Sequence, residues 1–141
     1  MSPTNPIPWH LRPVSVLAFL WALALTGDFL NRQYGIMTYP EGSVHDWGAL
    51  IDALPVLPDL LWTLGAWAAL AGALMLLLLE RYAPVVLGLA ALALAASTIL
   101  TLAGGEVPVA EPAALVMIVA TLLGIVIWLY SRAQRMHGFL G

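Results

Sequence analysis

Residues 17–32, Leu-Ala-Phe-Leu-Trp-Ala-Leu-Ala-Leu-Thr-Gly-Asp-Phe-Leu-Asn-Arg, decide the fold of this chain. The first nine are apolar, and Asp28 is the only acid placed inside a long apolar segment. A helix that starts near Pro13 and ends near Leu30 would be about 26 Å long, which crosses a thin hydrocarbon core. The stretch therefore predicts a membrane-spanning helix whose last turn is polar.

The composition of the whole chain agrees with a membrane location. The sequence has 141 residues, of which 62% are hydrophobic and 9% are charged. Soluble domains carry roughly 25% charged residues, so too few polar side chains are present to cover a soluble fold. We expect an integral membrane protein with a single four-helix membrane domain over residues 1–141.

Three further apolar segments follow the first one. We expect an all-α, polytopic bundle whose four transmembrane helices span about 13–30, 60–79, 83–102 and 113–130. The short turn Glu80-Arg81-Tyr82 predicts that the second and third helices form an antiparallel hairpin. Residues 44–53 carry apolar side chains at helical spacing and predict a short amphipathic helix at the interface, between helices one and two.

The arginines predict the orientation in the membrane. Arg12, Arg81, Arg132 and Arg135 fall on one side of a four-span bundle, and Arg32 falls on the other. The positive-inside rule then places both termini in the cytoplasm, as expected for a multi-pass protein of a bacterial inner membrane. Lys is absent and the net charge is −3, which argues against nucleic-acid binding and against a polybasic lipid-binding patch.

Small residues predict where the helices pack. Gly65 and Gly72 lie in the second span and Gly88 lies in the third, each among alanines three or four residues away. Such spacing lets helix backbones approach closely in lipid. We expect these small residues to face each other across the hairpin. The leucines on the opposite faces, which include Leu76, Leu87 and Leu94, are expected to face lipid or a partner.

Asp28 is a candidate for either a structural or a functional role. An acid inside a membrane segment is costly and by default suggests function. Arg32 follows four residues later, where a guanidinium and a carboxylate can pair on one helix face. Asp28 and Arg32 are therefore predicted to form a structural polar pair, and the alternative is that Asp28 binds a cation or a substrate.

A few other side chains inside the spans carry polar or aromatic groups. Trp21 and Trp67 lie deeper than the other tryptophans, and either pack in the bundle or contact a pigment, a quinone or a lipid tail. Ser97, Thr98 and Thr101 are expected to bond back to carbonyls one turn earlier, with a small polar pocket as the alternative.

No combination of residues suggests catalysis or metal binding. The chain has no Cys, and His10, His45 and His137 are far apart in sequence, so three metal ligands are not assembled. No serine, histidine and acid share a spacing that supports a catalytic triad. We expect no enzymatic activity, no metal and no cofactor.

The chain resembles a family of small, uncharacterised four-helix bacterial membrane proteins, some of which are labelled sugar transporters. The residues that carry this resemblance are Trp9-His10-Leu11, Leu20-Trp21, Gly27-Asp28-Phe29, Leu54-Pro55, Trp62, Gly65, Trp67, Gly72, Arg81, Tyr130, Arg132, Met136, Gly138 and Leu140. Family members often have Asn after the first-helix Trp, where this chain has Ala22. The resemblance implies a four-helix bundle and makes Asp28 part of the family pattern.

Two classes of function remain. The first is a non-catalytic accessory or structural subunit that packs against a larger membrane complex, respiratory or photosynthetic. The second is a small-solute, sugar-like transporter or exporter that works as a homo-oligomer around Asp28. Coupled transporters usually place an ionisable group or a broken helix near the midplane, and the three later spans contain no charge. The sequence therefore favours the accessory subunit, with the lipid bilayer and a membrane protein as its partners.

Overall fold

The computed structural model describes residues 6–36, 54–105 and 111–141. In these ranges the chain is all-helical, with the helices α1 (Leu11–Tyr34), α3 (Val56–Leu77), α4 (Ala83–Gly104) and α5 (Glu111–Met136). Each contains a segment long and apolar enough to cross a membrane. The prediction of four membrane-length helices is confirmed. The amphipathic helix predicted for 44–53 lies outside the described residues.

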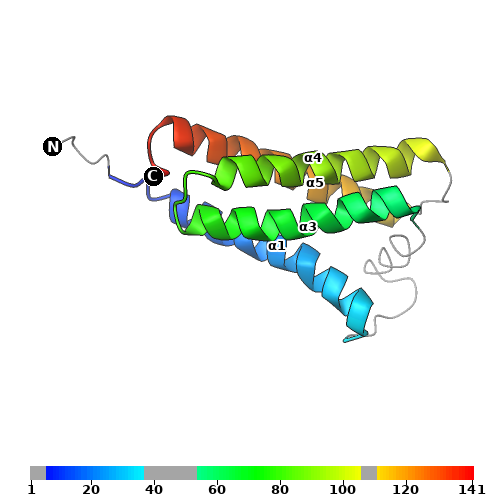
Figure 1. Cartoon of the computed structure of the whole chain (residues 1–141). Coiled ribbons are helices and arrows are strands. Elements are labelled where there is room, and N and C mark those ends of the chain that lie inside the picture. Colours follow the sequence, from blue (N-terminus) through cyan, green and yellow to red (C-terminus); the bar gives the residue numbers. More distant parts are fainter. Residues whose placement is uncertain (1–5, 37–53, 106–110) are drawn as a thin grey trace.

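The helices run alternately up and down in one bundle (Figure 1). α3 packs between α1 and α4, and α5 packs behind α4, where it also contacts α1. The start of α1, the turn between α3 and α4 and the end of α5 lie at the same end of the bundle. Arg12, Arg81, Arg132 and Arg135 belong to these segments, and we call this end the arginine end.

The helices extend beyond the predicted apolar spans. α1 continues past Leu30 to Tyr34 and ends at Gly35, whose left-handed backbone (φ 61°) lets its N–H donate to the carbonyl of Asn31. α5 continues past Tyr130 through Arg132 and Arg135. Arg, Ala and Gln are good helix formers, so a helix continues where apolarity stops. Hydropathy marks the membrane-buried part of a helix and misses its polar end.

The turn between α3 and α4 closes in a Schellman motif. The N–H of Glu80 donates to the carbonyl of Met75, and the N–H of Leu79 donates to that of Leu76. Leu79 occupies the left-handed position (φ 62°) that usually belongs to glycine. The end of the chain folds back on this turn, because the N–H of Gly141 donates to the Leu79 carbonyl.

Leucine side chains of α4 pack against two glycines of α3. A Cβ on Gly65 would lie 2.8 Å from Leu94 side-chain atoms, and a Cβ on Gly72 would lie 2.7 Å from Leu87. Leu94 and Leu87 are fully buried, as is Leu76. The expectation that these three leucines face lipid or a partner is wrong. Leucine fills the space that glycine leaves, which gives more dispersion contact than two facing rows of small residues.

Gly72→Leu should lower the stability of the bundle. The added side chain would collide with Leu87, and overpacking of this kind costs about 1–3 kcal/mol. Gly27→Leu is the matched control, because it adds the same side chain to a helix where nothing lies within 4 Å. The measurement is the unfolding midpoint in a mild detergent. Equal midpoints for the two variants would contradict the packing of Leu87 over Gly72.

Candidate functional site

Buried hydroxyl groups inside the bundle bond to the protein itself. Ser15, Thr26 and Thr101 donate to carbonyls one turn earlier, at 2.7–2.8 Å. Ser97 and Thr98 differ from the expectation because they bond between helices. Ser97 donates to the Pro58 carbonyl of α3 at 2.7 Å, and the hydroxyl of Thr98 lies 2.8 Å from that of Thr121 on α5.

The hydroxyls of Ser97, Thr98 and Thr101 all bond within the protein. Thr101 alone of the three lines a cavity of about 250 Å³ between the start of α3 and the end of α4. The other residues that line it are Leu54, Pro55, Leu57, Pro58, Leu100 and Gly104. Because this lining is almost entirely apolar, the cavity offers a polar solute little to bind.

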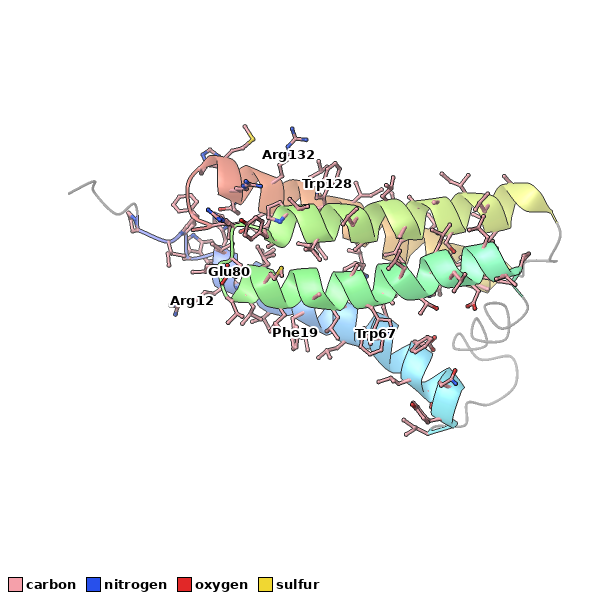
Figure 2. All side chains as sticks on the ribbon, in the orientation of Figure 1. Arg12, Phe19, Trp67, Glu80, Trp128 and Arg132 are labelled. Carbon is pink, nitrogen blue, oxygen red and sulfur yellow. The ribbon has the colours of Figure 1, made fainter. Side chains whose placement is uncertain are left out.

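The two deep tryptophans both contact other helices. Ring atoms of Trp21 lie 3.3–3.4 Å from where a Cβ on Gly124 of α5 would be, so the indole fills the space beside this glycine. Trp67 is 43% exposed and packs edge-to-face on Phe29 of α1, with 6.0 Å between ring centroids. Figure 2 shows Trp67 on the side of α3 that faces α1. Both rings thus join α1 to its neighbours.

Asp28 is half-buried in the last third of α1, away from the arginine end. It has an interaction partner in the structure. The side chain of Arg32 lies outside the described residues, so the pairing of Asp28 with Arg32 stays a prediction. A carboxylate at this depth is near one end of the helix and far from the middle of the bundle.

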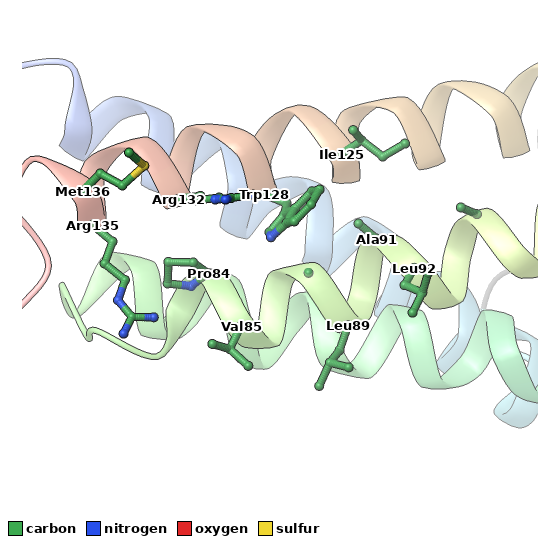
Figure 3. Close-up of a pocket in the computed structure, with 12 residues that line it drawn as sticks. Pro84, Val85, Leu89, Ala91, Leu92, Ile125, Trp128, Arg132, Arg135 and Met136 are labelled. Carbon is green, nitrogen blue, oxygen red and sulfur yellow. The ribbon is translucent and has the colours of Figure 1, made fainter.

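A groove of about 900 Å³ lies between α4 and α5 (Figure 3). Its α4 wall is uncharged and includes Pro84, Gly88, Ala91 and Leu92. Gly88, predicted to pack within the hairpin of α3 and α4, lies instead beneath Trp128 of α5. A Cβ on Gly88 would be 2.8 Å from the indole nitrogen. The groove exists because small residues on α4 leave space that α5 does not fill.

One stripe of α5 forms the other wall. Trp128, Arg132 and Arg135 are spaced by four and three residues, so they lie on the same helix face. Ile125 extends the stripe toward the middle of the helix. In Figure 3 the side chain of Arg135 extends from α5 toward the start of α4. Along the groove the lining therefore changes from apolar to aromatic to cationic.

The polar groups of this stripe have no partner among the described residues. Neither Arg132 nor Arg135 forms an ion pair there, and the indole N–H of Trp128 has no acceptor. Both arginines are exposed. Glu80 is the only described acid at the arginine end, and it lies on the turn between α3 and α4 (Figure 2). Two like charges three residues apart favour a bound anion.

Sequence reasoning did not assign these residues to a site. Arg132 and Arg135 served as markers of the orientation in the membrane, and Trp128 was given no role. The signal was present in the spacing of 128, 132 and 135, which is one face of a helix. It was missed because the span was ended at Tyr130, where hydropathy drops.

The hydrogen bond between Thr98 and Thr121 should couple α4 to α5. In a double-mutant cycle with Thr98→Val and Thr121→Val, we expect a coupling free energy of about 0.6 kcal/mol, the usual size inside membranes. Thr101→Val serves as the control, since Thr101 bonds only to its own helix, at the Ser97 carbonyl. Unfolding in mixed micelles supplies the free energies. Coupling of Thr101 to Thr121 of the same size would contradict the assignment.

Comparison with known proteins leaves the family open. The chain matches none of the protein-family models, curated proteins or solved structures with which it was compared. The resemblance to small four-helix bacterial membrane proteins, some labelled sugar transporters, therefore stays a prediction.

Proposed function

We propose that the protein is a non-catalytic accessory or structural subunit of a bacterial inner-membrane complex, respiratory or photosynthetic. The observation that carries the proposal is the interior of the bundle. Leu76, Leu87 and Leu94 fill its centre, and its buried hydroxyls bond to carbonyls or to each other. A coupled carrier needs an ionisable group or an unwound helix near the midplane.

The distribution of charge supports the same reading. α4 carries no charged residue, and Asp59 lies in the first turn of α3. Arg132 and Arg135 lie in the last two turns of α5. Charges at helix ends reach the interface, where they cost little. Such a pattern suits a protein that packs in the membrane better than one that moves a polar solute through it.

The outer surface of α1 supports docking against another membrane protein. Only 28% of the most apolar 18-residue stretch of α1 is buried inside the protein, the lowest share among the four described helices. Figure 1 shows α1 diverging from α3 toward Tyr34. Val16, Leu17, Leu20 and Leu23 are all more than 40% exposed, so α1 keeps an apolar face for lipid or a partner.

Native electrophoresis of gently solubilised membranes tests the proposal. We expect the tagged protein to migrate in one complex with a second membrane protein in fixed stoichiometry. Deletion of the gene should lower the abundance of that complex, and the wild-type gene should restore it. Asp28→Asn should leave this restoration intact, because the role does not need the carboxylate to bind a solute.

The opposite outcome favours the transporter. The protein would then form assemblies of its own copies alone, and Asp28→Asn would abolish the cellular phenotype while abundance and melting stay unchanged. That pattern would overturn the accessory role and assign Asp28 to a cation or a substrate.

The orientation proposed with this function has the arginine end in the cytoplasm. Reporters fused before Met1 or after Gly141 should be cytoplasmic, and one inserted near Gly42 should be periplasmic. The physical reason is that four of the five arginines lie in segments at one end of the bundle, and cations are retained on the cytoplasmic side. A periplasmic reporter signal at the C-terminus would contradict it.

A further inference from the structure

We propose that the groove between α4 and α5 binds one anionic phospholipid. Its phosphate lies between Arg132 and Arg135, its ester region beside Trp128, and one acyl chain along the apolar wall of α4. The lipid site does not depend on the proposed function. It lies on α4 and α5, whereas the exposed apolar face that would contact a partner protein lies on α1.

The shape of the groove fits a chain-like apolar ligand. Its volume of about 900 Å³ lies within the range of sites for small amphiphilic ligands. Gly88 and Ala91 form a low floor, and Leu89 and Leu92 stand exposed beside it. The groove opens toward the side of the bundle, so a lipid can enter from the bilayer without crossing the interior (Figure 3).

The charge of the groove selects the headgroup. Guanidinium groups bind phosphate oxygens through paired hydrogen bonds. No described carboxylate pairs with Arg132 or Arg135, so both are available to an anion. A headgroup that adds an ammonium group would be repelled by the same two cations. Two arginines at a defined groove suffice for one lipid, even though the chain lacks the polybasic patch that would attract an anionic surface.

The order of groups along α5 matches the order of groups in a phospholipid. Trp128 lies one turn deeper than Arg132, and its indole N–H points into the groove over Gly88. Indoles favour the ester region of the bilayer, where one face is apolar and the N–H is wet. Ile125 and Leu92 continue the lining at acyl-chain depth.

Other occupants fit less well. A neutral quinone or pigment would leave two guanidinium groups without a counter-charge. A second copy docked groove to groove by a two-fold axis would bring four arginines together, which is repulsive. The anionic lipid satisfies the cations and the apolar wall at once.

The test measures lipid binding to the delipidated full chain in neutral detergent. Native mass spectrometry would compare dioleoyl-phosphatidylglycerol with dioleoyl-phosphatidylcholine, and thermal melting would report stabilisation. We expect one phosphatidylglycerol bound with a preference of roughly 30-fold over phosphatidylcholine, the effect of two cations near an anionic headgroup. Arg132→Gln with Arg135→Gln should remove most of this preference.

Arg12→Gln is the matched control, because Arg12 is exposed at the same end of the bundle but does not line the groove. It should keep the preference. Trp128→Phe should weaken binding of both lipids while it keeps the preference. The melting of each variant without lipid shows whether it is folded.

Four results would overturn the proposal. They are equal binding of the two lipids by the wild type, an unchanged preference in the double variant, an equal loss in Arg12→Gln, and stabilisation by inorganic phosphate as large as that by phosphatidylglycerol. A wild-type dimer that the double variant converts to monomer would assign the groove to a second copy instead.

Discussion

The close approach of α3 and α4 is the contact on which the rest of the bundle depends. In lipid, the hydrophobic effect does not drive helices together, so association relies on dispersion and on complementary shape. Leu94 over Gly65 and Leu87 over Gly72 supply that shape over two turns of the pair. Alanines 66, 69 and 73 continue the buried face of α3. A rigid hairpin results, against which α1 packs through α3 and α5 packs through α4.

Hydrogen bonds between helices add to the stability of this hairpin and of its contacts with α1 and α5. Ser97 joins α4 to the first turn of α3, and Thr98 joins it to α5 through Thr121. At the arginine end, His10 lies 2.7 Å from the Tyr130 hydroxyl and ties the start of α1 to α5. Each such bond contributes roughly 0.6 kcal/mol in a membrane protein, so together they fix register more than they drive association.

The groove is also formed by small residues, in this case Gly88 and Ala91 of α4, but no leucine fills the space beside them. Each glycine of α3 packs against a leucine of α4, whereas the side chain nearest to Gly88 of α4 is Trp128 of α5. The difference leaves a lateral opening beside Arg132 and Arg135. A bundle with a closed interior and a cationic, laterally open groove is suited to hold lipid and to stand beside other membrane proteins.

The sequence by itself determined the class of fold. Composition and the length of the apolar runs fix four membrane helices, since a polar-poor chain has to satisfy its backbone internally in lipid. The Glu80-Arg81-Tyr82 hairpin and the glycines as sites of close approach also follow from local patterns.

Only the tertiary structure decided which side chain fills the space beside each glycine. That choice depends on the rotation of α3 against α4, and this rotation buries Leu87 and Leu94. The packing of α5 on α4 also placed Trp128, Arg132 and Arg135 beside the small residues of α4. Hydropathy identifies each helix separately, whereas a groove depends on how two helices pack against each other.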